Sequence, residues 1–108
     1  MTKEFNDDAS FRSSVASALR DLLDQLESEE HDPQLSEGNL KIVFESGGTF
    51  VLSQQTPMHE LWLSANLTAW HFRRVGGIWQ ERDSEESMLD VLNTLFSDKL
   101  GLDIRFSL

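Results

Sequence analysis

The sequence predicts an α+β domain in which two helices lie on one face of an antiparallel sheet. Three observations lead to this prediction: an amphipathic helical pattern opens the chain, alternating strand patterns follow, and a second helical pattern precedes a last alternating segment. The 108 residues suit one hydrophobic core, and no internal linker is longer than a turn. We therefore expect a single domain spanning residues 1–108.

The first helix is predicted from about Phe5 to Glu27. At about 100° per residue its apolar side chains form one stripe. The stripe consists of Phe11, Val15, Ala18, Leu19, Leu22, Leu23 and Leu26. Asp21 and Asp24 fall on the opposite face as i, i+3 neighbours, and Glu27 continues their row. Carboxylates near the negative end of a helix dipole are unfavourable for stability, which indicates another role for them.

An antiparallel meander is predicted for the middle of the chain. A short acidic edge strand is expected around Glu30, Asp32 and Gln34, because Pro33 is tolerated only at a sheet edge. Alternating apolar residues then predict a hairpin over residues 40–53 and further strands over residues 60–64, 70–73 and 78–82. The glycine pairs at 47–48 and 76–77 are interpreted as hairpin turns.

Trp62 is expected on the polar face of its strand, because Leu61 and Leu63 must both point to the core. Glu60 and Ser64 would share that polar face. A large ring in this position is typical of a protein interaction hot spot, and the alternative is that a third layer of the chain covers it.

The second helix is predicted to begin at Asp83, with Glu86 completing a pattern like a capping box, and to stop at Gly101. Its apolar stripe contains Met88, Leu89, Leu92, Leu95, Phe96 and Leu100. A last strand is expected over residues 102–108, where Leu102, Ile104, Phe106 and Leu108 alternate.

Charge and composition exclude several function classes. The formal net charge of −10 argues against a nucleic-acid partner, because phosphate binding depends on clustered Lys and Arg. With no cysteine, the chain has no disulfide, no thiolate nucleophile and no thiolate ligand for zinc or an iron-sulfur cluster. The apolar runs are too short to cross a bilayer, and the first residues lack a signal pattern, so no membrane association and a cytoplasmic location are expected.

No enzyme motif is found. The segment from His59 to Leu63 begins like the zinc-protease helix, but Leu63 stands where the second histidine is needed. The three histidines, His31, His59 and His71, lie in separate predicted elements and are interpreted as surface residues.

The carboxylates between the first helix and the edge strand are a candidate metal site. The cluster consists of Asp21, Asp24, Glu27, Glu29, Glu30 and Asp32, and no Lys or Arg occurs between Asp21 and Glu37. These hard oxygen ligands suit Fe, Mn, Ca or Mg ions, although the pattern of a calcium-binding loop is missing. The alternative is a solvated acidic face without a ligand.

The segment Gln55-Thr56-Pro57-Met58-His59-Glu60-Leu61-Trp62-Leu63-Ser64 resembles the signature of the frataxin family, and His71-Phe72, Gly76 and Trp79 continue it. The similarity is to the bacterial, CyaY form and covers essentially the whole chain. It implies a two-layer sandwich of two helices and an antiparallel sheet, and a role in iron-sulfur cluster assembly.

The resemblance also implies sites and partners. The family binds iron (Fe2+/Fe3+) weakly through an acidic ridge, which corresponds here to the six carboxylates of the cluster. It docks on the cysteine desulfurase and its scaffold protein, so Asp21, Asp24 and Glu30 would meet the desulfurase, and Trp62 and Arg73 the scaffold. Ser13, Ser14, Ser17, Arg20 and Gln34 depart from a densely acidic ridge and confine it to residues 21–32.

The leading interpretation is a binding protein and not an enzyme: an iron-sensitive regulator or iron donor that holds no cluster itself. It is expected to be a monomer, with iron-dependent oligomers as a further expectation. The alternatives are a ferroxidase or iron-storage activity at the ridge, and an acidic interaction module without a metal role.

Overall fold

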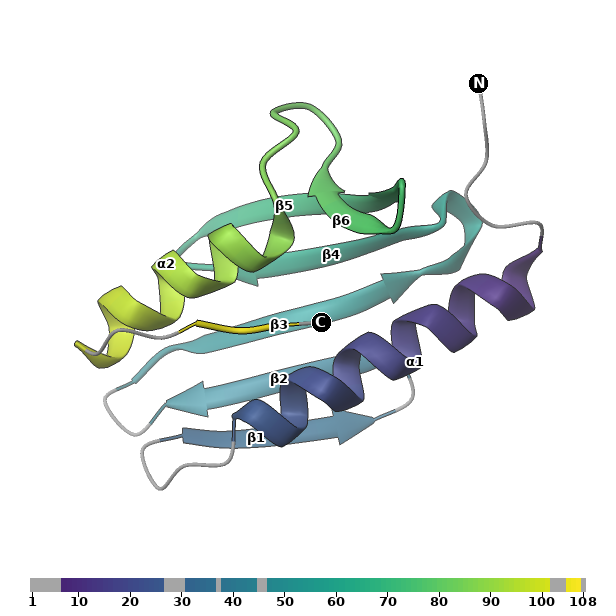
Figure 1. Cartoon of the computed structure of the whole chain (residues 1–108). Coiled ribbons are helices and arrows are strands. Elements are labelled where there is room, and N and C mark those ends of the chain that lie inside the picture. Colours follow the sequence, from purple (N-terminus) through teal and green to yellow (C-terminus); the bar gives the residue numbers. More distant parts are fainter. Residues whose placement is uncertain (1–6, 27–30, 37, 45–46, 102–104, 108) are drawn as a thin grey trace.

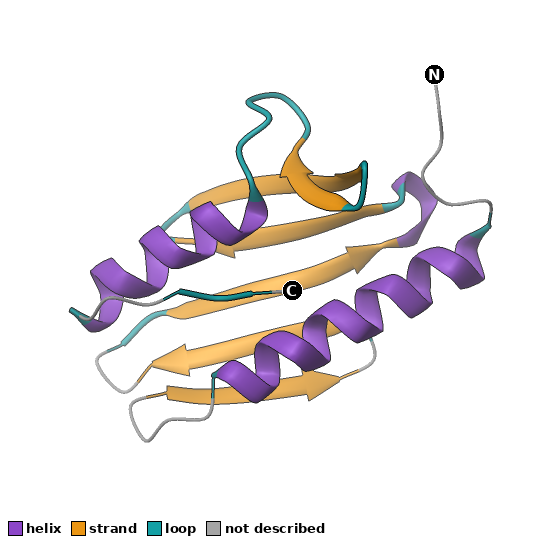
Figure 2. Cartoon of the chain, viewed as in Figure 1, coloured by secondary structure: helices purple, strands orange, loops and turns teal. Residues whose placement is uncertain are grey.

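A computed structural model describes the chain over residues 7–26, 31–36, 38–44, 47–101 and 105–107. Its elements, in chain order, are α1 (Asp8–Gln25), β1 (His31–Ser36), β2 (Asn39–Phe44), β3 (Thr49–Gln55), the 3-10 helix η1 (Thr56–Met58), β4 (Glu60–Ala65), β5 (Thr68–Val75), β6 (Ile78–Glu81) and α2 (Met88–Leu100). Neighbouring strands are antiparallel in the order β1 to β6. Both helices cover the same face of the sheet (Figures 1 and 2), which confirms the predicted α+β sandwich.

Helix α1 is shorter than predicted. It begins at Asp8 because Asp7 is extended and its side chain accepts a hydrogen bond from the Ser10 amide at 2.8 Å. It ends at Gln25, and the predicted bounds, Phe5 and Glu27, lie outside the described residues. The buried residues of the helix all belong to the predicted stripe: Phe11, Val15, Ala18, Leu19 and Leu22.

The strands give the sheet one face under the helices and one open face. In β4, Leu61 and Leu63 are buried and Trp62 is half-buried on the other face, as predicted. The predicted hairpin is formed by β2 and β3. Pro33 lies in β1 at the sheet edge, which confirms the prediction for that strand.

The turns on either side of β5 have the same backbone form. Gly76 and Gly77 have φ of +59° and +81°, as a two-residue type I′ hairpin requires. Asn66 and Leu67 take similar values, +51° and +62°, without glycine. Leu67 is also fully exposed, so a large apolar side chain gains no burial in a conformation that is unfavourable for it.

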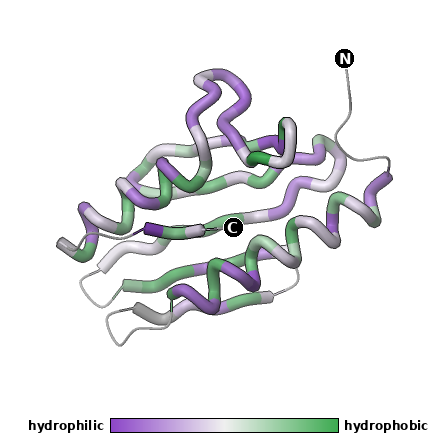
Figure 3. Tube along the Cα trace, in the orientation of Figure 1, coloured by the Kyte–Doolittle hydropathy of each residue, from purple (hydrophilic) through white to green (hydrophobic). Residues whose placement is uncertain are grey.

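The start predicted for α2 is wrong. The N-cap is Ser87, whose hydroxyl accepts a hydrogen bond from the Asp90 amide, and the end at Gly101 is as predicted. Residues 82–86 form a hydrophilic loop (Figure 3) that folds around Glu81. The amides of Asp83 and Ser84 donate to Glu81 Oε1 at 2.7 and 3.0 Å, so they are bound by this carboxylate and do not begin a helix.

The described part of the predicted last strand, residues 105–107, is not a strand. The Phe106 amide donates to Asn93 Oδ1 of α2 at 2.7 Å, and the Ser107 amide donates to Gln25 Oε1 of α1 at 2.9 Å. Helix side chains thus take the place of a neighbouring strand. The segment lies between the two helices (Figure 1), and Leu102, Ile104 and Leu108 lie outside the described residues.

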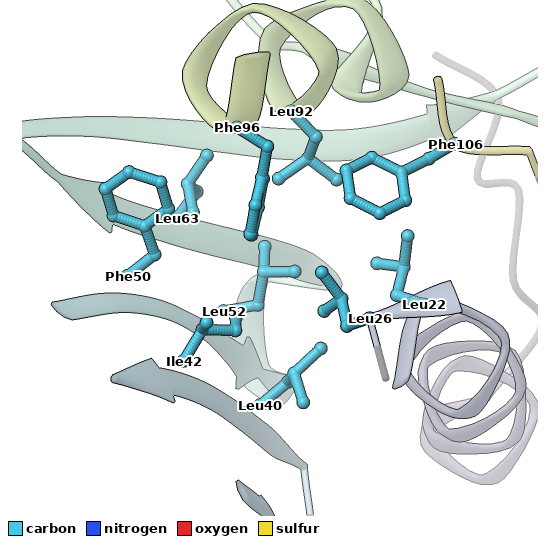
Figure 4. Close-up of a pocket in the computed structure, with 10 residues that line it drawn as sticks. All are labelled: Leu22, Leu26, Leu40, Ile42, Phe50, Leu52, Leu63, Leu92, Phe96 and Phe106. Atoms are coloured by element: carbon cyan, nitrogen blue, oxygen red, sulfur yellow. The ribbon is translucent and has the colours of Figure 1, made fainter. Parts of the chain in front are cut away.

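The core between the layers is aromatic and tightly packed. Phe96 contacts Phe50 and Phe106 edge to face, with ring centroids 5.3 and 5.1 Å apart. A cavity of about 10 Å³ lies among apolar side chains from the sheet, both helices and Phe106 (Figure 4). A space this small, lined by apolar groups, is a packing void and not a ligand site.

Candidate interaction and metal sites

The predicted carboxylate cluster begins on α1, where Asp21 and Asp24 are both exposed, as expected for its solvent face. The last turn of the helix has no basic residue. The negative end of the helix dipole therefore strengthens the negative electrostatic potential around these carboxylates. Such a surface attracts cations or a basic protein.

The rest of the cluster lies outside the described residues. Glu27, Glu29 and Glu30 belong to that part of the chain, and Asp32 has its backbone in β1 opposite Val43 while its side chain is not described. Within the described ranges, no group of three or more His, Cys, Asp or Glu residues could hold a metal ion. The structure places Asp21 and Asp24 on one helix face, and ligation by the whole cluster stays a prediction.

The N-terminal half of α1 has a different surface. Ser13, Ser14 and Ser17 line a shallow groove that also includes Arg74 of β5. Arg20, further along the helix, is exposed. The carboxylates of the predicted site that can be described are therefore confined to the C-terminal end of α1.

The open face of the sheet also differs in charge from the chain as a whole. Among the described residues of β2 to β6, Lys41 and Arg73 are exposed cations on this face, and Arg82 follows just after β6. The carboxylate on the same face of these strands is that of Glu60, which is only 6% exposed. Because Arg82 is paired with Glu60, Lys41 and Arg73 are the exposed cations that these strands present on a chain of net charge −10.

Trp62 occupies the centre of this face. Its ring packs edge to face on His71, the residue directly opposite in β5, with ring centroids 4.6 Å apart. Its indole Nε1 donates a hydrogen bond to Glu60 Oε1 at 2.8 Å. The predicted position of Trp62 is confirmed, and no third layer from the described residues covers it completely, because the ring remains partly exposed.

Glu60 and Arg82 support Trp62, a role that sequence reasoning missed. Arg82 Nη1 donates to Glu60 Oε1 and Oε2 at 3.1 and 3.4 Å. The spacing of Glu60 and Trp62 does place both on one face of a strand. Arg82 gave no such signal, because its contact joins residues 22 positions apart.

Arg73, the other predicted partner residue, lies on the same open face as Trp62 and is exposed. It is opposite Glu60 in the pairing of β4 with β5. Even so, Glu60 pairs with Arg82, and the structure gives Arg73 no ion pair with a described residue. Its guanidinium is therefore available to a carboxylate of a partner.

The segment from His59 to Leu63 leads into strand β4 and is not the helix that the zinc-protease motif requires. His59 itself has a structural role. It ends η1 with φ of +50°, and β4 begins at the next residue. Its Nε2 lies 2.8 Å from Asp8 Oδ1, and its ring stacks on Phe11 at 4.9 Å. His59 thus fastens the start of α1 to the sheet.

Over the described residues, neither helix combines the length and the apolar character that crossing a membrane requires.

The chain matches the frataxin-like domain over residues 3–102. It belongs to the frataxin family. The iron-sulfur cluster assembly protein CyaY of Pseudomonas fluorescens (strain SBW25) is 36% identical to this frataxin over 95 residues, 86% of each chain. A protein of the same name from Ralstonia nicotianae (strain ATCC BAA-1114 / GMI1000) is 34% identical over 65 residues, 60% of this chain and 58% of that one.

Solved frataxin structures share the fold. Frataxin from Psychromonas ingrahamii superposes with a TM-score of 0.87 at 18% identity, over 94% of this chain and 99% of that one. Yeast frataxin superposes with a TM-score of 0.73 at 20% identity, over 94% of both chains. A trimeric frataxin from Saccharomyces cerevisiae, complexed with ferrous, gives 0.63 at 20% identity, over 94% of this chain and 91% of that one. The predicted frataxin-like sandwich is confirmed.

Proposed function

We propose that this frataxin acts in iron-sulfur cluster assembly as an iron-binding regulator or iron donor. The observation that carries the proposal is the match to a CyaY protein, named for iron-sulfur cluster assembly, over 86% of both chains. The partners in this proposal are the cysteine desulfurase and its scaffold protein, in the cytoplasm. The chain acts by binding, and no bond-making step is assigned to any side chain.

The geometry supports two separate docking surfaces. Asp21 and Asp24 are exposed on the helix layer, whereas Trp62 and Arg73 lie on the open face of the sheet. Because the helices and the open face are on opposite sides of the sheet (Figure 1), one partner at each surface would not exclude the other. This arrangement suits a protein that joins or regulates a two-component assembly.

Iron binding is assigned in this proposal to the carboxylates of residues 21–32. Carboxylate oxygens are hard ligands that suit iron, and an exposed set of them would hold the ion weakly, with water completing its coordination. The related Saccharomyces cerevisiae trimer is a ferrous complex, which is consistent with this choice of ion. Iron and a basic partner would then compete for the same carboxylates.

A pull-down against the cysteine desulfurase tests the electrostatic part of the proposal. Reversing Asp21, Asp24 and Glu30 to lysine should abolish capture at low salt, and high salt should weaken capture of the unchanged chain. The triple reversal of Glu85, Glu86 and Asp98 to lysine, at exposed positions elsewhere, makes the same charge change; it is the matched control and should bind normally. Equal capture of the triple variant and the control would contradict the proposed surface.

The ferroxidase alternative gives a different result in an oxygen-uptake assay. A ferroxidase would oxidise Fe(II) catalytically, at a rate far above that of buffer, and would lose this activity when Asp21 and Asp24 are neutralised. A binding protein would sequester Fe(II) without turnover beyond its stoichiometric sites. Sustained turnover of Fe(II) would indicate that the chain is a ferroxidase and not a binding protein.

A further inference from the structure

The indole N–H of Trp62 is bound within the chain. Nε1 donates to Glu60 Oε1 at 2.8 Å, and Glu60 is 6% exposed. An indole has one hydrogen-bond donor and no acceptor. Since that donor is already used, the exposed part of the Trp62 ring offers a partner its apolar and π surface only.

Arg82 holds the carboxylate that receives this hydrogen bond. Its Nη1 lies 3.1 Å from Glu60 Oε1, so the same oxygen accepts from both Arg82 and Trp62. Arg82 follows β6, and β5 separates β6 from β4, so the arginine side chain spans β5 to reach Glu60. A buried carboxylate requires such a cation or further donors, because its loss of hydration is otherwise uncompensated.

His71 restricts the ring from a further direction. It is paired with Trp62 across β4 and β5, and the two rings meet at 77°. The indole is therefore held by its hydrogen bond at one edge and by the imidazole beside it. A ring that is fixed before docking loses less side-chain freedom when a partner binds.

We propose that Glu60 and Arg82 are positioning residues for Trp62, and that they direct its N–H to the Glu60 carboxylate so that a protein partner contacts the ring alone. The partner side chain that fits is apolar or aromatic and not a hydrogen-bond acceptor. The identity of this partner as the scaffold protein rests on the proposed function. The positioning itself is a property of the free chain.

Solvent exchange of the indole N–H signals, measured by NMR on the free full-length chain, tests the positioning. Trp70 and Trp79 provide reference signals in the same spectrum. Glu60→Ala should speed exchange at Trp62 at least about tenfold, whereas Glu60→Gln, whose amide oxygen still accepts, should keep part of the protection. Glu86→Gln, an exposed carboxylate in the same region, is the matched control and should change nothing. Unaltered exchange at Trp62 in Glu60→Ala would overturn the proposal.

Binding to the scaffold protein, measured by calorimetry, tests how the ring is contacted. Trp62→Phe keeps apolar ring faces and lacks the N–H, so it should bind within about threefold of the unchanged chain, whereas Trp62→Ala should lose at least about tenfold. A loss in Trp62→Phe as large as that in Trp62→Ala would show that apolar ring faces are not sufficient for binding, and would overturn the proposal. If the unchanged chain does not bind the scaffold, the proposed function fails, and the exchange rates still decide the positioning role.

Discussion

Arg82 and Glu60 form an ion pair whose two sides are unequally exposed to water: the arginine side chain is 33% exposed and the glutamate side chain 7%. They lie on either side of β5, so the pair joins the end of β6 to the start of β4. The unequal exposure determines which partner the fold can lose more easily.

Arg82→Met should destabilise the chain more than Glu60→Gln. The first change leaves a buried carboxylate without its cation, and it should cost about 1–3 kcal/mol. The second leaves an arginine that water can solvate, so its cost should be smaller. Urea unfolding of the two variants, with Glu86→Gln as the control, measures the difference. A larger loss for Glu60→Gln would contradict the unequal role of the two residues.

Glu81 should make the stability depend on pH in the acidic range. Burial alone would raise its pKa, but hydrogen bonds from the amides of Ser84, Asp83 and His71 outweigh burial and hold the pKa below the ordinary 4.5. A lowered folded-state pKa contributes stability above the unfolded value, and this contribution is lost as pH falls through the folded value. The free energy of unfolding should therefore fall as the pH is lowered below about 4.5. It should fall less steeply in Glu81→Gln than in the unchanged chain. An equal slope in both chains would contradict this role for Glu81.

Leu67→Gly should stabilise the chain. Leu67 has φ of +62° and is fully exposed, so glycine relieves an unfavourable backbone conformation without loss of burial. The gain should be about 0.5–1 kcal/mol, because the Asn66-Gly pair suits a type I′ turn. Thermal unfolding measures it, and Leu67→Ala, which keeps the Cβ atom, should show little change. Destabilisation by glycine would indicate that Leu67 has a role in the fold.

Arg73→Glu should weaken scaffold binding and reduce its dependence on salt. Arg73 is an exposed cation beside Trp62, and charges at the rim of an interface act mainly through association rate and screening. Arg12→Glu makes the same charge change on the helix layer and should leave the binding unaffected. Association rates at two salt concentrations distinguish the variants. Identical behaviour of the two would remove Arg73 from the interface.

Much of the fold could be predicted from the periodicity of the sequence. The alternation around Trp62 placed it opposite Leu61 and Leu63, and the apolar stripe from Phe11 to Leu22 defined the buried face of α1. These elements follow from one-sided burial, which leaves a repeating pattern in the chain. The order of the elements along the chain already predicted two helices on one face of the sheet, and the family resemblance implied the same sandwich.

Two predictions, the start of α2 and the last strand, were wrong because side chains form hydrogen bonds with the backbone there. The residues after Glu81 have the composition of a helix start, but the Glu81 carboxylate binds the amides of Asp83 and Ser84 and delays the helix to Met88. At the other end of the chain, Asn93 binds the Phe106 amide and replaces a strand partner. Neither contact has a periodic signature.

The sequence could predict which residues of the candidate sites lie on one exposed face, but not which side chains contact one another there. The face of Trp62 and the exposure of Asp21 and Asp24 follow from position along an element. The burial of Glu60 depends on Arg82, which is brought close only when β4, β5 and β6 have paired. Ligation by the other carboxylates, from Glu27 to Asp32, stays a prediction.

The most direct test of the account is one NMR shift map on a single labelled sample, recorded with Fe(II), with the desulfurase and with the scaffold protein in turn. Fe(II) and the desulfurase should both perturb residues 21–32, and the scaffold should perturb the open face around Trp62 and Arg73. Signals of residues 21–32 that remain unmoved by both Fe(II) and the desulfurase would contradict the central claim of an iron-binding docking surface.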